Sequence, residues 1–258
     1  MTAAPAGRRA PALLALGLSR HYGPHAALDR IDLEIPAGEF VALLGPNGAG
    51  KSTLLRLFAT LIRPTAGRLE VHGLDPRRAE RAPLARRIGL LSHQTFLYDH
   101  LTGLENLLFY ARLYGLPDAQ GAARAALRAV GLEDRGSDLL RTYSRGMQQR
   151  LAIARTLLHD PDIVLLDEPF TGLDPEASDR LHERLGGARA AGATCVMATH
   201  DLGAGLRLAD RVVVLVSGRL VADRPAREID APSLGALVRQ TAREPGAARE
   251  PDAAWSAP

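Results

Sequence analysis

Short apolar runs separated by turn residues fill the first third of the chain. They have the length and composition of β-strands, and they cover Leu13–Leu18, Ile31–Ile35, Phe40–Leu44, Arg68–Val71 and Ile88–Ser92. The segment Pro36–Glu39 contains a proline and a glycine, which are typical of turns. We therefore predict a strand-rich N-terminal third.

The middle of the chain has apolar residues at helical spacing. Helices are predicted over residues 106–114, 119–130 and 145–159. Thr102 and Glu105 form a capping box ahead of the first helix, because the hydroxyl and the carboxylate can each satisfy an orphan amide. Gly131 ends the second helix and Pro161 ends the third.

The last third returns to apolar runs separated by helical stretches. These runs suit parallel strands that are buried on both faces, and they cover Ile163–Leu166, Thr194–Ala198 and Val212–Val216. We predict one α/β domain over residues 13–242 with an inserted helical lobe at about 95–160, rather than two independent domains. Residues 1–12 are expected to be flexible, and residues 243–258 have too few apolar side chains to fold.

The composition is that of a soluble globular protein, with 46% hydrophobic and 24% charged residues. The formal net charge is only +3, and no run of about five to eight basic residues occurs, so a nucleic-acid partner is not expected. The single cysteine, Cys195, excludes an internal disulfide, and its apolar neighbours predict a buried, inert thiol. No apolar stretch reaches the roughly 18 residues of a membrane span, and we expect a cytosolic chain.

Lys51 is the only lysine, so 31 of the 32 basic residues are arginine. Its compact ammonium can enter a phosphate site that fits a planar guanidinium poorly. The segment Gly45–Ser52 matches the P-loop pattern G-x-x-x-x-G-K-[ST] and lies between a predicted strand and a predicted helix over 52–61. In this pattern backbone amides and the lysine bind phosphate, and the Ser52 hydroxyl can bind Mg²⁺. The predicted nucleotide-binding residues are Gly45, Pro46, Asn47, Gly48, Ala49, Gly50, Lys51, Ser52 and Thr53.

Two adjacent carboxylates, Asp167 and Glu168, end the apolar run at 163–166. They point in different directions because side chains alternate along a strand. We assign Asp167 to Mg²⁺ and Glu168 to activation of the attacking water as a general base.

With these motifs in this order, the chain resembles the ATP-binding subunit of an ABC transporter over residues 13–239. The resemblance implies further site residues. Gln94 lies where the family has the glutamine that senses Mg²⁺ and the γ-phosphate and couples to the membrane partner. Asp174 matches the D-loop, and His200 matches the switch histidine at the γ-phosphate. Tyr22 is placed like the aromatic residue that stacks on adenine.

The family signature, LSGGQ, corresponds to residues 143–147 of this chain. The matched positions are Ser144, Arg145, Gly146 and Met147. Ser144 and Gly146 keep the hydroxyl and the small residue that face the γ-phosphate of a partner subunit from a helix N-terminus. Tyr143, Arg145 and Met147 depart from the consensus, which leaves the fine geometry of this segment open.

The resemblance also implies cofactors, partners and a fold. The cofactors are ATP and Mg²⁺, and each nucleotide lies between the P-loop of one subunit and the signature of another, either a second copy or a related chain. A separate integral-membrane subunit would carry the cargo, with this chain peripheral at the cytoplasmic face of the inner membrane. The implied fold is a P-loop NTPase core with an antiparallel β subdomain and an inserted helical lobe.

The type of transporter is less sharply indicated. The segment Leu91–Leu116 is similar to the ATP-binding subunit of the haem exporter of cytochrome c biogenesis, but drug and polysaccharide exporters share much of its pattern. A soluble ABC ATPase that acts on DNA or ribosomes is a different class; such proteins generally carry two cassettes or a long coiled coil, and this chain has neither. A GTPase is excluded because the base-reading Asn-Lys-x-Asp is absent.

Overall fold

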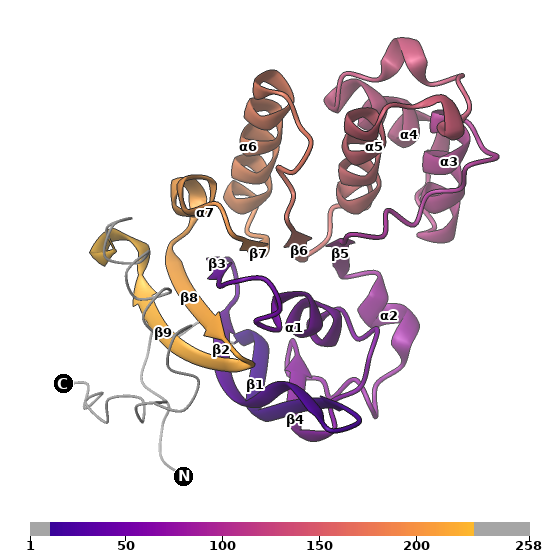
Figure 1. Ribbon diagram of the computed structural model, residues 1–258. Coiled ribbons are helices and arrows are strands. Elements are labelled where there is room, and N and C mark those ends of the chain that lie inside the picture. The colour runs from indigo at the N-terminus through magenta and orange to yellow at the C-terminus, as the bar shows by residue number, and fades with distance from the viewer. Residues whose placement is uncertain (1–10, 230–258) are drawn as a thin grey trace. The chain divides into compact units, whose positions relative to one another are not determined.

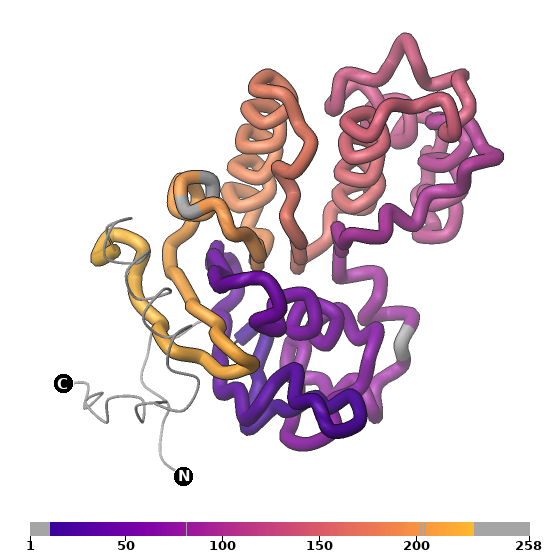
Figure 2. The backbone as a smooth tube through the Cα atoms, in the orientation of Figure 1, coloured from indigo at the N-terminus to yellow at the C-terminus, as the bar shows by residue number. Residues whose placement is uncertain are grey.

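The computed structural model of the chain describes residues 11–229. These residues form two compact units (Figures 1 and 2). The first unit contains the described residues up to Ala79 and from Val196 onward, and the second contains Glu80–Cys195. Strand β7 (Thr194–Thr199) begins in the second unit and ends in the first. The second unit therefore extends beyond the helical lobe that the sequence predicts at 95–160.

An antiparallel three-stranded sheet lies in the first unit. Its strands are β1 (Pro11–Tyr22), β2 (His25–Pro36) and β4 (Ala66–Val71), in the order β2-β1-β4. The sheet confirms three strands of the sequence prediction and lengthens all of them; β1 starts two residues before the expected domain boundary. Its apolar face is buried, with Leu13 opposite Ile35 on one side and Val71 on the other.

The other strands of the first unit surround the loop that follows β3 (Phe40–Leu44). Strand β8 (Arg211–Val216) runs parallel to β3, and β9 (Arg219–Pro225) runs antiparallel to β8. Both β3 and β8 are almost wholly buried, which is why their sequences are apolar without alternation. The helices of this unit are α1 (Lys51–Phe58), α7 (Leu202–Leu208) and a 3₁₀ turn at Ala226–Glu228.

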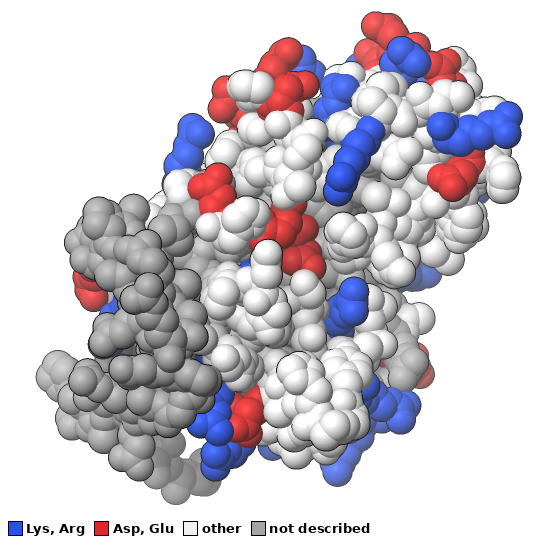
Figure 3. All heavy atoms as spheres, in the orientation of Figure 1, with Lys and Arg blue, Asp and Glu red and all other residues white. Residues whose placement is uncertain are grey.

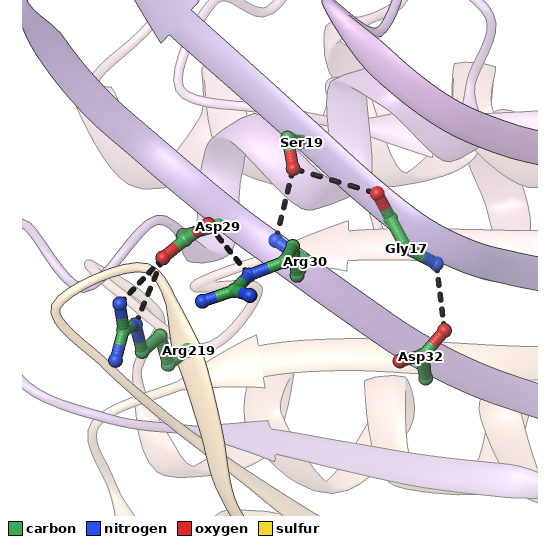
Figure 4. A network of polar contacts seen from close by, with 6 residues as sticks. All are labelled: Gly17, Ser19, Asp29, Arg30, Asp32 and Arg219. Atoms are coloured by element: carbon green, nitrogen blue, oxygen red, sulfur yellow. Dashed lines mark hydrogen bonds and ion pairs between the residues drawn. The ribbon is translucent and has the colours of Figure 1, made fainter.

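Polar side chains fix the place where β1 and β2 lose regular register (Figure 4). The amide of Arg30, which has φ 50°, donates to Ser19 Oγ at 2.9 Å. The amide of Gly17 donates to Asp32 Oδ1 at 2.6 Å. The two side chains satisfy amides that a bulge takes out of the strand ladder. On the face shown in Figure 3, basic and acidic side chains are interspersed.

The second unit combines two parallel strands with helices. Strands β5 (Ile88–Leu91) and β6 (Ile163–Asp167) pair in parallel. The helices are α2 (Arg81–Ala85), α3 (Gly103–Leu113), α4 (Ala119–Ala129), α5 (Arg145–Leu157) and α6 (Pro175–Ala190), with 3₁₀ turns at Glu133–Arg135 and Leu140–Thr142. The predicted capping box is confirmed: Thr102 Oγ1 accepts from the Glu105 amide, and Glu105 accepts from the Thr102 amide.

Buried polar groups organise the core of the second unit beneath α3 and α5. The Arg155 side chain donates to the Leu90 carbonyl at 2.6 Å and lies over the rings of Phe96 and Tyr110. Burial lowers the pKa of Arg155. Asn106 is fully buried and bonds to the backbone of the segment that precedes α3. These contacts fix the chain between β5 and α3.

Several details differ from the sequence prediction. Helix α3 begins at Gly103, because the capping box places the first helical residue directly after Thr102. Helix α5 ends at Leu157, two residues early. Strand β9 is not among the predicted strands, since charged residues interrupt its apolar ones and none of its residues is buried. Cys195 is fully buried, as expected. The predicted tail at 243–258 lies outside the described residues.

Candidate functional site

The P-loop follows β3 and is packed closely against its surroundings in the first unit. Gly45 has φ 153°, and a Cβ there would collide with the carbonyl of Leu215. Gly50 has φ 106°, and a Cβ there would lie 2.5 Å from the carbonyl of Ala27. Neither position accepts a side chain, so the sequence must place glycine at both. The backbone of the loop therefore packs directly against the carbonyls of Leu215 and Ala27.

Lys51 is the first residue of α1 and is 7% exposed. Its ammonium reaches back across the loop and donates to the carbonyl of Gly45 at 2.6 Å and to that of Pro46 at 3.1 Å. Helix α1 has no acidic residue in its first turn, so its positive N-terminal end is not offset there. A buried ammonium beside a helix N-terminus fits a polyphosphate. Ser52 and Thr53 follow in the same turn and are half-buried.

The turn between β8 and β9 supports the P-loop. The amide of Gly218 donates to the carbonyl of Ala49 at 2.9 Å, and the amide of Asp29 donates to the carbonyl of Gly218 at 2.8 Å. Arg219 joins the same turn to β2 through Asp29, with Nη2 at 2.6 Å and Nε at 3.0 Å from Oδ2 (Figure 4). The hydrogen bond from Arg219 lowers the pKa of Asp29. Backbone and side chains of β2 thus both hold the turn that contacts the P-loop.

Tyr22 and His200 also belong to the first unit. Tyr22 ends β1 and is 43% exposed. The guanidinium of Arg20 lies 4.5 Å from the centre of the Tyr22 ring. The same guanidinium donates to the Arg63 carbonyl at 2.9 Å. His200 directly follows β7 and is exposed.

Asp167 ends β6 in the second unit and Glu168 directly follows it, and both are half-buried. Glu168 has φ 51°, a left-handed conformation that is uncommon outside glycine. The amide of Thr171 donates to the Glu168 carbonyl at 3.2 Å. From α5, Gln149 Nε2 donates to the Pro169 carbonyl at 3.1 Å. The chain therefore turns sharply at Glu168 rather than continuing the strand.

The signature segment forms the N-terminus of α5 in the same unit. Ser144 is the N-cap, and its Oγ accepts from the Met147 amide at 3.3 Å. Arg145 is exposed. Tyr143 is buried, and its hydroxyl donates to the Arg135 carbonyl at 2.7 Å. That hydrogen bond accounts for the tyrosine at a position where the family consensus has leucine.

The remaining predicted residues lie on either side of this segment in sequence. Asp174 is the N-cap of α6, where Oδ1 accepts from the Ala177 amide at 2.8 Å, and Pro175 follows at the first helical position. Gln94 is exposed after β5, and its carbonyl accepts from Ser92 Oγ at 2.7 Å.

The structure groups the predicted residues within each unit. The P-loop, Tyr22 and His200 lie in the first unit, whereas the carboxylates, the signature, Gln94 and Asp174 lie in the second. Sequence reasoning missed Gln149 and Asn106. A polar residue on the apolar stripe of a predicted helix is the signal for Asn106; no local signal marks Gln149, because its partner is 20 residues away.

Comparison with known proteins decides the family. The ABC transporter family matches residues 28–171. The chain belongs to this family. It is 39% identical over 232 residues to the daunorubicin resistance ATP-binding protein DrrA3 of Streptomyces coeruleorubidus, covering 89% of this chain and 73% of that protein. It is also 39% identical to the Nod factor export ATP-binding protein I of Cupriavidus metallidurans (84% and 72% covered) and to the glutamine transport ATP-binding protein GlnQ of Escherichia coli (80% and 88% covered).

Solved structures agree with this assignment. The structure of an ATP-binding subunit of an ABC transporter has a TM-score of 0.80 and 32% identity, covering 88% of this chain and 98% of that one. The dimeric MJ0796 cassette bound to ADP and Pi has a TM-score of 0.77 and 28% identity, covering 83% and 99%. The protein is thus an ATP-binding subunit of an ABC transporter with the ABC ATPase fold, and its family hydrolyses ATP, pairs with membrane subunits and dimerises.

Two predictions from the sequence concern the type of transporter and membrane-spanning segments. The relatives named above are drug-resistance, Nod factor export and glutamine transport proteins, and none of them is a haem exporter. In the part of the chain that the structure describes, no helix combines the length and the apolar character that crossing a bilayer requires.

Proposed function

We propose that this ABC transporter subunit binds MgATP and uses its hydrolysis to drive export through a separate integral-membrane subunit. The P-loop carries the proposal. Gly45 and Gly50 are held where no side chain fits, and Lys51 is buried at the N-terminus of α1. This arrangement binds the phosphates of a nucleotide through backbone amides and one ammonium.

The proposal gives each predicted residue a role at the nucleotide. Residues 45–53 hold the phosphates, and the open face of Tyr22 stacks on the base. The groups that hold Mg²⁺ are Ser52, Gln94 and Asp167. Mg²⁺ offsets the charge of the phosphate oxygens when bound. Glu168 takes the proton of the attacking water, and His200 donates a hydrogen bond to the γ-phosphate.

A second subunit completes the nucleotide site in this proposal. The N-terminus of α5, with Ser144 as its cap and residues 145–147 in its first turn, faces the γ-phosphate held by the partner's P-loop. Asp174 lines the subunit interface. The dimeric MJ0796 cassette supports this arrangement, and the partner is a second copy or a related chain.

The exposed aromatic surface of the second unit is the proposed contact with the membrane subunit. It consists of Phe96, Tyr98, Phe109 and Leu113, which are between 41% and 59% exposed. The rings of Tyr98 and Phe109 meet edge to face with 5.1 Å between their centres, and the surface lies beside a groove along α3. Large apolar side chains grouped on a surface mark an interaction site. Phe96, the first residue of this surface, is two residues after Gln94. The proposed partner contact and the proposed nucleotide site are therefore neighbours in the sequence.

Export of a drug or a polysaccharide is the first candidate for the cargo. Two of the named relatives act in drug resistance and Nod factor export, although a glutamine transport protein is equally similar. Haem export in cytochrome c biogenesis is the second candidate, and the residues at 91–116 are the observation that favours it. In either case the chain acts at the cytoplasmic face of the inner membrane.

Co-purification tests the proposal. The full chain is tagged and recovered from detergent-solubilised native membranes, and mass spectrometry identifies what it retains. A multi-span membrane protein is the expected partner, and cytochrome c assembly factors beside it would favour haem. Recovery of ribosomes or DNA without a membrane protein would contradict the proposal. Leu113→Asp should lose the partner, whereas the matched control Leu74→Asp, at an exposed leucine of the first unit, should keep it.

A further inference from the structure

The conformation of Glu168 requires support from its surroundings. A non-glycine residue with φ 51° costs about 1 kcal/mol or more, and such residues persist only where neighbouring contacts hold them. Within the loop that follows, the Thr171 amide bonds to the Glu168 carbonyl, and the Leu173 amide bonds to the Phe170 carbonyl. Both hydrogen bonds lie within the loop itself.

Contacts from outside the loop come from α5 and α6. The ring of Phe170 stacks on His182 of α6 with 4.4 Å between the ring centres. Gln149 of α5 donates its side-chain amide to the Pro169 carbonyl at 3.1 Å. Pro169 is buried and is the residue directly after Glu168. The Gln149 bond is therefore the closer of the two to the strained residue in sequence.

The first turn of α5 touches the same loop at a second place. A Cβ added to Gly146 would lie 3.0 Å from the Gly172 carbonyl. The backbone of the signature thus rests on the loop, one turn before Gln149. The N-terminal part of α5 therefore meets the loop at two places, Gly146 against Gly172 and Gln149 against Pro169.

We propose that Gln149 is a positioning residue for Glu168, so that the signature helix of a subunit sets the direction of the catalytic carboxylate of that same subunit. The inference rests on the proposed function, since it takes Glu168 as the general base. Gln149 does not touch nucleotide in this account. It holds the carbonyl of Pro169, the residue after Glu168, and a change at the α5 N-terminus reaches Glu168 through that hydrogen bond.

The test compares kcat, KM for MgATP and ATP-dependent dimerisation of the purified full chain and its variants. Gln149→Met keeps the length of the side chain but cannot donate. We expect kcat to fall about 10- to 100-fold, because misplacing a reacting group by about 1 Å costs up to about 100-fold. KM and dimerisation should stay within about twofold. Gln120→Met, at an exposed glutamine of α4, is the matched control.

Gln149→Glu gives a second readout that a folding defect would not produce. A carboxylate beside the Pro169 carbonyl cannot donate, whereas a protonated carboxyl can. Its kcat relative to wild type should therefore be low at pH 8 and rise at least about threefold toward pH 6, as proximity of the carbonyl favours the neutral acid.

The outcomes separate this inference from the proposed function. An unchanged kcat in Gln149→Met overturns the inference, and so does a loss that appears in KM and dimerisation instead of kcat. A pH-independent ratio for Gln149→Glu also overturns it. Glu168→Gln is measured in parallel: if that variant hydrolyses ATP normally, the proposed function fails and the inference with it.

Discussion

His159 gives the second unit a sensitivity to acid that can be measured. Its ring stacks on Tyr114 with 3.7 Å between centres and a 12° tilt, and both of its ring nitrogens are buried. Burial is the main cause that lowers its pKa to about 4. The hydrogen bond to the Ile88 backbone and the nearby Asp160 oppose this shift, and Arg155 adds to it. The neutral ring is therefore the form that the fold accommodates.

The sign of the pH dependence follows from this pKa. The folded value of about 4 lies below the ordinary value of about 6.5, so the unfolded chain binds the proton first as the pH falls. Stability is lost between about pH 6.5 and pH 4. Proton linkage gives a loss of about 2 to 3 kcal/mol at pH 4.5 and close to zero at pH 7.

The perturbation is His159→Phe, which keeps a stacked ring and removes the titration. Urea unfolding followed by circular dichroism would give the free energy of unfolding of variant and wild type at both pH values. We expect near-equal stabilities at pH 7 and an advantage of about 2 to 3 kcal/mol for the variant at pH 4.5. His100→Phe, at an exposed histidine, is the control and should show no pH-dependent difference. If the free energies of unfolding of His159→Phe and wild type differed by the same amount at both pH values, the reasoning would be refuted.

Three further predictions concern other parts of the chain. Asn106→Ala removes three hydrogen bonds to the backbone of residues 98 and 102 and should cost about 2 to 4 kcal/mol in urea unfolding; a cost below about 1 kcal/mol would contradict it. Gly50→Ala places a Cβ against the Ala27 carbonyl, so calorimetry should show ATP affinity reduced more than about tenfold, and unchanged affinity would be contrary. Asp29→Arg should raise KM for ATP about two- to fivefold, and adding Arg219→Asp should restore it; a double variant no better than the single one would show that the ion pair does not support the P-loop.

Local patterns account for the parts of the fold that the sequence predicted. The apolar runs of β3 and β8 are buried on both faces, so composition alone marks them. The capping box before α3 is set by two residues three positions apart. The P-loop is also a local pattern, since its glycines and Lys51 all lie within residues 45–51.

Non-local contacts explain what the sequence could not show. Strand β9 pairs with β8, and its Val221 and Ala222 pack against a core cluster to which β8 contributes. The hydrogen bond from Gln149 to the Pro169 carbonyl joins residues that are 20 positions apart, and neither residue type predicts it. Tyr143 departs from the signature consensus, and only the structure shows that its hydroxyl donates to the Arg135 carbonyl. In each case the contact depends on a partner elsewhere in the chain, so the local sequence does not predict it.

The central claim is that the chain hydrolyses ATP through Glu168 while the P-loop binds it. The most direct measurement is phosphate release and ATP-dependent dimerisation of wild type, Glu168→Gln and Lys51→Ala, with light scattering to follow mass. The account predicts hydrolysis by wild type, a stable ATP-bound dimer without hydrolysis for Glu168→Gln, and neither activity for Lys51→Ala. Near-normal hydrolysis by Glu168→Gln, or unchanged ATP affinity in Lys51→Ala, would contradict it.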